Sequence, residues 1–362
     1  MRSWLLWYHV EGFFITLRHI NLAVMETEYV VGIGELLWDM LPGGRRLGGA
    51  PANFAYHVSQ FGLKSVVVSA VGDDEAGDAA LAELAGRAGL EDRAVLSGRS
   101  ELDGAGRSEP SCRAGRAEES SVAEPAGRFG TMISRVGFPT GTVGIELDAA
   151  GVPQYDIRMP VAWDNIPFTP ALKELASRTR AVCFGTLARR CPVSRSTVSE
   201  FVDAVPRGEG QWRIFDINLR EQFYSRDIVL QALEQCNILK INDEELETVT
   251  EMLDLRGGDI PGRCRDLMNR HSLEILILTC GVHGSYVFSS GDAVSFLETP
   301  KVEVADTVGA GDSFTAAFTA ALLRGKPVSE AHRLAVDVSA YVCTCEGAMP
   351  VLPESLLRRL RQ

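Results

Sequence analysis

A glycine-rich run near the C-terminus is the part of the chain best suited to chemistry. Asp306-Thr-Val-Gly-Ala-Gly-Asp312 leads directly into a stretch with helical periodicity. The backbone N–H groups at the start of a helix, together with its positive end, form an anion site, and small residues let a phosphate approach closely. Asp312 would stand beside that anion, either as a general base or as a simple helix cap. The second aspartate upstream and the strong helical pattern favour the catalytic interpretation.

The elements expected around this run alternate between strands and helices. Helical patterns run from Pro51 to Phe61 and from Asp312 to a closing Gly325. This alternation predicts an α/β fold with a doubly wound, mostly parallel sheet, whose ligands bind at the carboxyl ends of the strands. The runs expected to form buried strands are Tyr29–Ile33, Ser65–Val71, Ala181–Phe184, Arg213–Ile217, Ile238–Ile241 and Ile275–Thr279.

Three segments depart from this alternation. Residues 141–157 alternate like exposed strands around a turn at residues 148–151, and they predict a small β-lid. Residues 97–135 are rich in Gly, Ser, Arg and Glu, so we expect a disordered insertion that can be deleted. Residues 1–24 are aromatic and apolar, but charged residues interrupt them before they reach the roughly 18 apolar residues of a spanning helix. We interpret them as an extension upstream of a natural start at Met25.

The composition excludes several classes of protein. The 362 residues are 46% hydrophobic, enough for one large α/β domain. The net charge of −12, without a basic patch, argues against a nucleic-acid partner. The eight cysteines contain no Cys-x-x-Cys pair, and Cys343-x-Cys345 lacks the second pair of a zinc site. We therefore expect reduced thiols and a cytoplasmic location.

Two signatures in the sequence resemble those of one enzyme family. The run at residues 306–312 resembles the C-terminal signature of the ribokinase-like (PfkB) carbohydrate kinases. Gly48-Gly-Ala-Pro-Ala-Asn53 looks like that family's N-terminal Gly-Gly-x-x-x-Asn motif. The resemblance spans about residues 29–96 and 136–353, with the motifs in the family's order. It implies a ribokinase-like kinase domain over residues 25–362.

Two further runs look closest to the fructokinase-like branch of that family. They are Gly34-Glu35-Leu-Leu-Trp38-Asp39 and Ala162-Trp-Asp-Asn-Ile-Pro167. The lid implied by the resemblance would consist of residues 37–48 and 138–160.

The resemblance implies a role for each residue of the two signatures. Asp312 would take the proton from the attacking sugar hydroxyl. The N–H groups of Gly309, Ala310 and Gly311 would hold the charge on the transferred phosphoryl group. Without the resemblance, three of the implied sugar-binding residues each have a structural alternative. Asp39 could equally be an exposed turn residue, Asn53 an amide on a helix surface and Arg220 part of a surface ion pair. The implied sugar-binding residues are Asp39, Gly48, Gly49, Asn53 and Arg220.

The ATP and ion sites that the resemblance implies lie after the later strands. Asn242-Asp-Glu-Glu245 resembles the family's Asn-x-x-Glu motif, in which Glu245 would help to hold hydrated Mg²⁺. The same carboxylate would also complement a helix dipole. Cys280 stands where relatives often carry Lys. The residues implied for the nucleotide are Asn242, Thr279, Gly281 and Gly284, and those implied for a monovalent cation such as K⁺ are Asp306, Val308, Val342 and Gly347.

These features predict Mg·ATP-dependent phosphorylation of a sugar hydroxyl, with fructose 6-hydroxyl as the best single acceptor. The alternatives are 2-keto-3-deoxygluconate or another sugar and, from a different class, a catalytically silent sugar-binding regulator. A dinucleotide oxidoreductase is less well supported, because no Gly-x-Gly-x-x-Gly follows the first strand. The expected partners are a sugar and ATP, without nucleic acid or membrane. The resemblance also implies a homodimer through the lid.

Overall fold

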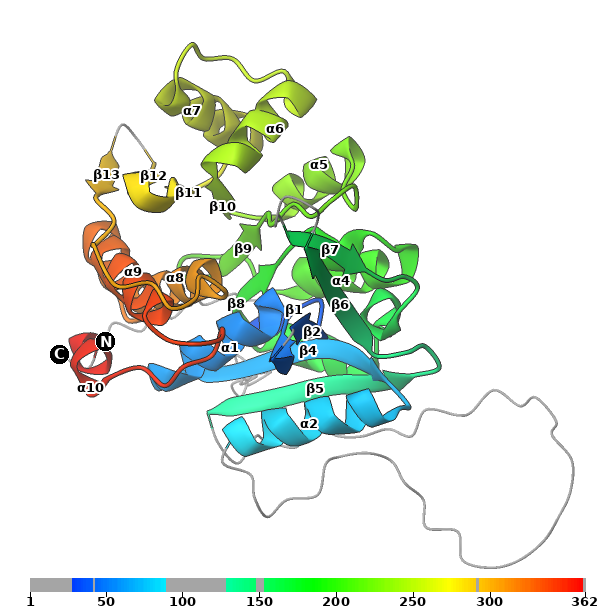
Figure 1. The fold of residues 1–362 in the computed structure, drawn as a ribbon. Helices are drawn as coiled ribbons and strands as arrows, with labels where there is room; N and C mark the ends of the chain where they lie inside the picture. The colour runs from blue at the N-terminus through cyan, green and yellow to red at the C-terminus, as the bar shows by residue number, and fades with distance from the viewer. Residues whose placement is uncertain (1–27, 42, 89–127, 148–152, 291–292, 361–362) are drawn as a thin grey trace, which may run out of the picture.

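The computed structural model describes residues 28–41, 43–88, 128–147, 153–290 and 293–360. Its body is a nine-stranded sheet in the order β13-β12-β11-β10-β9-β8-β1-β4-β5 (Figure 1). All neighbouring pairs are parallel except β11–β12 and β12–β13 at one edge. The predicted doubly wound, mostly parallel sheet is therefore confirmed. The strands are β1 Tyr29–Ile33, β4 Lys64–Gly72, β5 Phe129–Val136, β8 Thr179–Phe184, β9 Trp212–Asp216, β10 Ile238–Asn242, β11 Ile275–Thr279, β12 Ser285–Ser289 and β13 Val294–Leu297.

Helices cover both faces of this sheet, so its central strands are buried on both sides. On β1, Val30 packs with the cluster that contains α8 and α9, whereas Val31 packs with the cluster on the opposite face. Since alternate residues of β1 point to opposite faces and both faces are apolar, β1 is a continuous apolar run. The helices on the first face are α1 Ala50–Gln60, α2 Glu75–Arg87, α8 Ala310–Leu323 and α9 Val328–Cys343, and those on the second are α3 Pro170–Ser177, α4 Pro192–Ala204, α5 Arg226–Gln235, α6 Asp243–Leu253 and α7 Ile260–His271.

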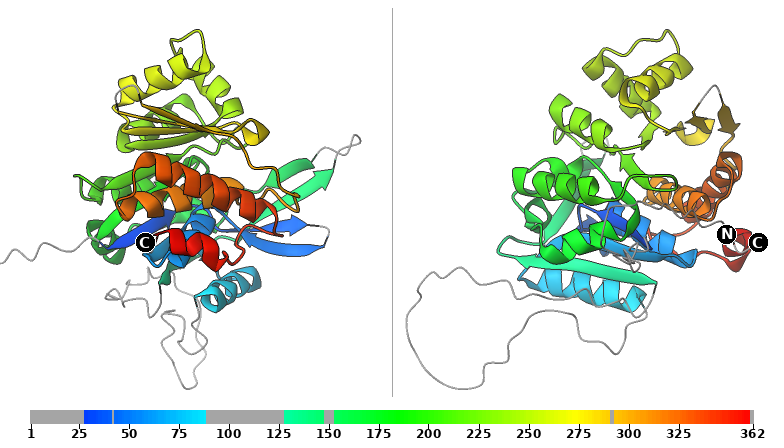
Figure 2. Two further views of the ribbon diagram at one scale, coloured as in Figure 1. Left: turned by 90° about the vertical axis from the view of Figure 1, so that its left-hand side faces the viewer. Right: turned by 180° about the vertical axis from the view of Figure 1, so that it is seen from behind.

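The two segments predicted to form the lid make a separate four-stranded sheet in the order β3-β2-β6-β7. Its strands project from the side of the body in Figure 2. The predicted turn at residues 148–151 lies outside the described residues. The strands are β2 Leu37–Leu41, β3 Gly44–Gly48, β6 Gly141–Leu147 and β7 Pro153–Ile157.

The predicted end of the disordered insertion is wrong. Residues 129–136 form strand β5, which pairs in parallel with β4 along its whole length. Phe129 is buried and packs edge-to-face on Tyr56. This strand was difficult to predict from the sequence, because an edge strand is half exposed and needs few large apolar side chains. Joining Leu96 to Val136 would remove strand β5, so we no longer expect that deletion to be tolerated. The rest of the predicted insertion, residues 97–127, and the predicted extension, residues 1–24, lie outside the described residues.

The helix after the glycine-rich run begins earlier than expected. α8 starts at Ala310, so Asp312 lies within its first turn instead of capping it. Gly309 precedes the helix with φ 77°, a left-handed conformation that favours glycine. The predicted closure is confirmed, because Gly325 has φ 74° just after the helix. Within the described residues, no helix is long and apolar enough to cross a membrane.

Candidate active site

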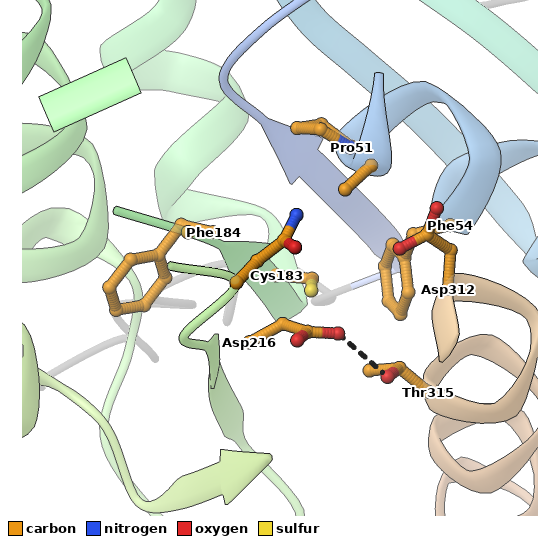
Figure 3. A pocket seen from close by; sticks show the side chains of 10 residues that line it. Pro51, Phe54, Cys183, Phe184, Asp216, Asp312 and Thr315 are labelled. Atoms are coloured by element: carbon orange, nitrogen blue, oxygen red, sulfur yellow. Dashed lines mark hydrogen bonds between the residues drawn. The ribbon is translucent and has the colours of Figure 1, made fainter. Parts of the chain in front are cut away.

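A pocket opens where β8 and β9 end and where α1 and α8 begin (Figure 3). This edge of the sheet is next to β1, at which the order of the strands reverses, and ligands of open α/β sheets bind there. Figure 3 shows side chains from both helices and both strands converging on the pocket. Its lining residues are Ala50, Pro51, Phe54, Cys183, Phe184, Gly185, Asp216, Asn218, Asp312 and Thr315.

Asp312, which lines this pocket, and Asn53 bring the two sequence signatures together. The Asn53 side-chain amide donates a hydrogen bond of 2.7 Å to Asp312 Oδ2, across 259 residues of sequence. Asn53 is only 3% exposed, so the alternative of a helix-surface amide is wrong. Its Oδ1 atom is buried and has no partner among the described residues. The pair therefore offers a carboxylate and an amide oxygen, both acceptors for hydroxyl groups.

Burial is the main cause that raises the pKa of Asp312, to about 6. The nearby Asp216 carboxylate raises it further, whereas the hydrogen bond from Asn53 and the charges of Lys240 and Arg220 lower it. A carboxylate with this pKa is mostly ionised at neutral pH and is a stronger base than an ordinary aspartate. Asp312 is thus suited to accept a proton from a bound hydroxyl.

The start of α8 lies where the sequence predicts an anion site. The first N–H groups of an α-helix have no partner within the helix. Gly309 could not be replaced without strain, since an added Cβ would lie 2.7 Å from Ala348. The N–H of Ala310 is directed at the Thr307 carbonyl at 3.3 Å, a long hydrogen bond that a phosphate oxygen could replace. Gly309, Ala310 and Gly311 therefore lie beside Asp312, as the glycine-rich run predicts.

The other predicted sugar-binding residues lie on or near the small sheet. Asp39 is on β2, so the alternative of a turn residue is wrong. Burial and, to a lesser degree, Asp306 raise the pKa of Asp39 to about 6. An added Cβ on Gly48 would lie 2.7 Å from Asp39 Oδ2, and Gly49 has φ 121°. Gly48 lets the chain pass close to this carboxyl group, whereas Gly49 lies against the Glu35 carbonyl.

Arg220 lies in the loop after β9 and is exposed. It donates a hydrogen bond to the Leu219 carbonyl. Its charge lowers the pKa values of Glu35, Asp39 and Asp312, so it faces the same site as all three.

Glu35 is a residue of the site that sequence reasoning quoted only as part of a motif. Its Oε1 atom accepts an N–H from Ala50 at the start of α1, at 3.3 Å. Its Oε2 atom is buried without a partner among the residues that the structure describes. Burial raises the pKa of Glu35 to about 7, and Asp312 adds to the increase. The only signal in the sequence is a carboxylate at the end of a buried strand.

Lys240 was missed altogether. It lies on β10, and its ammonium group forms an ion pair of 2.9 Å with Asp216 at the end of β9. The second oxygen of Asp216 accepts a hydrogen bond from the Thr315 hydroxyl on α8 (Figure 3). A lysine in the middle of a buried apolar strand was the signal that could have revealed it, because a buried lysine is almost always paired.

The residues predicted for Mg²⁺ and the nucleotide lie at the ends of β10 and β11. Asn242 and Thr279 are neighbours across these strands. Glu245 caps α6 reciprocally with Asn242, and its two oxygens accept the N–H groups of Asn242 and Leu219, each at 2.9 Å. The helix-capping role of Glu245 is therefore real. A carboxylate has about four acceptor positions, so two remain for water molecules of a hydrated cation.

A tight turn connects β11 to β12. Gly281 and Gly284 both have positive φ angles, of 52° and 101°. An added Cβ on Gly284 would lie 2.5 Å from the Leu297 carbonyl. Thr299 bridges the turn through the Gly281 carbonyl and the Gly284 N–H. The conformation of this turn therefore favours glycine at both positions.

Three of the four residues predicted for a monovalent cation meet near the glycine-rich run. Asp306 accepts the N–H of Val308 at 3.0 Å through one oxygen and that of Gly347 at 3.1 Å through the other. Val342 lies in the last turn of α9, and its carbonyl accepts the N–H of Cys345. Within the described part of the chain, no group of three His, Cys, Asp or Glu side chains is arranged to hold a metal ion.

Comparison with protein families gives one match over just over half of the chain. The model described as pfkB family carbohydrate kinase matches residues 168–355. The chain is 28% identical to the fructokinase of Klebsiella pneumoniae, covering 89% of this chain and 95% of the relative. It is 23% identical to the ATP-dependent 6-phosphofructokinase of Thermoanaerobacterium thermosaccharolyticum, covering 90% and 91% of the two chains.

Solved structures of sugar kinases share this fold. The fructokinase of Xylella fastidiosa with bound ATP superposes with a TM-score of 0.68 at 19% identity, over 92% of this chain and 98% of the other. A Vibrio cholerae fructokinase double mutant with fructose, ADP and a potassium ion gives 0.65 at 19% identity, over 92% and 99%. The ribokinase of Arabidopsis thaliana with ribose and ATP gives 0.65 at 20% identity, over 93% and 100%. The expected ribokinase-like fold is confirmed.

Proposed function

Because this chain belongs to the pfkB family of carbohydrate kinases, we propose that it transfers the γ-phosphate of ATP to the 6-hydroxyl of fructose. The hydrogen bond between Asn53 and Asp312 carries the proposal, since it joins the two signatures beside the pocket that Asp312 lines. A catalytically silent regulator is less well supported, because the base and the anion site beside it are both intact.

Asp312 acts as the general base in this proposal. The acceptor hydroxyl donates a hydrogen bond to the carboxylate, and its proton moves to Asp312 as the oxygen attacks the γ-phosphorus. A base so placed contributes about 10²–10⁴-fold to the rate. The hydrogen bond from Asn53 fixes one carboxylate oxygen and leaves the other for the substrate.

The first turn of α8 stabilises the transferred phosphoryl group. Its N–H groups and the positive end of the helix face the negative charge that builds up on the equatorial oxygens. Glycine at 309 and 311 lets this turn pack closely against Ala348 and Lys240. These groups do not have to move during the reaction, and this preorganisation is the source of the rate enhancement.

The substrate-facing acceptors suit a neutral polyhydroxylated sugar. The half-buried Asp39, the unpartnered Oε2 of Glu35 and the unpartnered Oδ1 of Asn53 are all hydrogen-bond acceptors. Sugar hydroxyls are donors to such groups, whereas the carboxylate of a ketodeoxy acid would be repelled by them. We therefore prefer fructose, with Arg220 available to bind the ring or the phosphate.

The ion and nucleotide assignments follow the same reasoning. We propose that Asn242, Thr279, Gly281 and Gly284 contact ATP and that Glu245 holds a water of the bound Mg²⁺. When bound, Mg²⁺ neutralises the charge of the phosphates during transfer. K⁺ near Asp306 would raise the activity over that in Na⁺ at equal ionic strength, and equal rates in the two salts would contradict this assignment.

The small sheet is proposed as the lid of the sugar site, because Asp39 lies on its strand β2. Apolar side chains on and beside this sheet are exposed, including Met40 and Phe138. A homodimer through the lid remains a prediction, and the mass of the protein in solution tests it.

The direct test is ADP release with Mg·ATP and a panel of acceptors. The panel contains fructose, other hexoses and ribose, 2-keto-3-deoxygluconate, fructose 6-phosphate and nucleosides. We expect the highest kcat/KM with fructose, with the product phosphorylated at the 6-position by NMR. Higher specificity for another acceptor would overturn the assignment of fructose, and an absence of ADP release with every acceptor would overturn the assignment of the reaction.

A further inference from the structure

A charged side chain lies in the face of the sheet that packs against α8. Lys240 stands two residues after Ile238 on β10, so both side chains point to the same face. Ile238 belongs to the apolar cluster formed with α8 and α9, and the side chain of Lys240 is only 12% exposed. Burying an ammonium group is strongly unfavourable unless it is paired. Its position therefore calls for a specific reason.

The ion pair that Lys240 forms is connected to the first turn of α8. Asp216 Oδ1 lies 2.9 Å from the Lys240 ammonium, and its Oδ2 lies 3.0 Å from the Thr315 hydroxyl. The same hydroxyl lies 3.0 Å from the carbonyl oxygen of Gly311. Two strands of the sheet are thus linked to the helical turn that carries Asp312.

Gly311 shows how close the ammonium group comes to this turn. A Cβ added to Gly311 would lie only 2.9 Å from Lys240 Nζ. A cation at the positive end of a helix is unfavourable unless negative groups surround it. Here the negative groups are Asp216 and Asp312.

We infer that the ion pair between Lys240 and Asp216 is a positioning element for the reaction, which fixes the orientation and the charge of the Asp312 carboxylate from beneath. This inference rests on the proposed role of Asp312 as the base. Neither residue of the pair needs to touch the substrate, since both act through Asp312 and the turn around it.

The charged surroundings of Asp312 explain why the pair is needed. Burial lowers the pKa of Lys240, but Asp216, Glu245 and Asp312 outweigh this effect and raise it to about 12, so Lys240 stays charged. Without Lys240, the Asp216 charge would oppose ionisation of Asp312 with less compensation. The groups that face Asp312 are Glu35 after β1, Cys183 on β8, Asp216 on β9, Arg220 after β9, Lys240 on β10 and the neutral Asn53 on α1.

The inference predicts opposite effects for two nearly isosteric variants. Lys240→Met removes the cation that lowers the pKa of Asp312, so the acidic limb of the kcat/KM profile moves to higher pH. Asp216→Asn removes the anion that raises it, so the limb moves to lower pH. Each shift should be about one pH unit or more, as a close charge typically produces. The double variant, which removes both charges, should return the limb toward that of the wild type.

The matched control is Lys326→Met. Lys326 lies just after the far end of α8 and forms a long surface ion pair with Glu330, at 3.7 Å. This variant changes the net charge by the same amount as Lys240→Met, so its profile should coincide with that of the wild type. A second readout is the carbon-13 titration of the Asp312 carboxyl group, assigned by its loss in Asp312→Asn, which requires no sugar.

The outcomes separate this inference from the proposed function. Opposite shifts of the two single variants, in the rate profile and in the carboxyl titration, support the inference. If both variants titrate like the wild type, or shift in the same direction, the pair has only a structural role and the inference is overturned. If the wild type phosphorylates no acceptor while the carboxyl titrations shift oppositely, the proposed function fails and the electrostatic coupling stands. If one single variant does not fold, the other single variant decides, because a titration shifted in the expected direction supports the inference and one like that of the wild type overturns it.

Discussion

Two buried ion pairs in this molecule have opposite surroundings. Arg190 and Asp164 are almost fully buried, at 2% and 0% side-chain exposure, and are joined by two hydrogen bonds of 2.8 and 2.9 Å. Asp164 also accepts the N–H of Val161, and Arg190 also donates to the Arg158 carbonyl. The Lys240–Asp216 pair has a single contact between its charges and lies beside a second carboxylate, that of Asp312.

The difference separates a structural use of charge from a functional one. The Arg190–Asp164 pair is electrically balanced and sits where the chain returns from strand β7 of the lid to the body, with Arg190 stacked over Trp163 at 4.0 Å. Around Lys240, the three carboxylates of Asp216, Glu245 and Asp312 outnumber its single ammonium group. A balanced pair holds two parts of the protein together, whereas an unbalanced group is available to a substrate or a proton.

The largest expected effect comes from the unbalanced region. Asp312→Asn should reduce kcat by about 10²–10⁴-fold, because the amide cannot accept the hydroxyl proton. The stability at pH 7.5 should be unchanged or higher, since a carboxyl group whose pKa is raised on folding opposes folding at any pH where it is ionised. Steady-state kinetics and thermal melting measure the two quantities. A variant with near wild-type turnover would show that Asp312 is only part of the helix start.

The balanced pair should respond in the opposite way. Asp164→Asn leaves the buried guanidinium of Arg190 without its counter-charge, and breaking such a pair typically costs about 3–5 kcal/mol. Denaturant unfolding should show this loss, while kcat of the folded enzyme at low temperature should fall less than about tenfold. A large loss of kcat without a loss of stability would place Asp164 in the catalytic machinery and break the comparison.

The pH dependence of the wild type follows from the raised pKa of Asp312. Since the base must be ionised, kcat/KM should fall as the pH drops through about 6, by about tenfold for each further unit. An ordinary aspartate would produce this decrease near pH 4. A profile that stays flat down to pH 5 would contradict the electrostatic description of the site.

The smallest effect is expected for an exposed ion pair. Arg263 contacts Glu247, whose side chain is 60% exposed, and such pairs contribute about 0–1 kcal/mol. Glu247→Gln should therefore change neither the unfolding free energy by more than about 1 kcal/mol nor the kcat. It is the control that shows whether burial, and not charge alone, causes the effects above.

The sequence was most informative where local pattern and chemistry coincide. β1 and β11 were predicted with their observed ends, because buried parallel strands are continuous apolar runs. Asn53 and Asp312 were each singled out by a motif, but their hydrogen bond was not predicted, because only the fold brings them together. Lys240 could not be assigned a role, since its partner belongs to a different strand. Strand β5 was missed because its pairing with β4 depends on tertiary structure and not on its own composition.

The hydrogen bond between Asn53 and Asp312 also has a consequence for synthesis. Its two residues are 259 positions apart, so a ribosome that adds about 5–20 residues per second makes the second roughly 13–50 s after the first. During that interval, the apolar side chains of Phe54 and Val58 on α1 lack the helix α8 against which they pack. A nascent chain is therefore inactive and exposes an apolar surface until its last quarter emerges. Chaperones should therefore bind the nascent chain mainly during that interval, and a chain whose synthesis stops within it should be inactive.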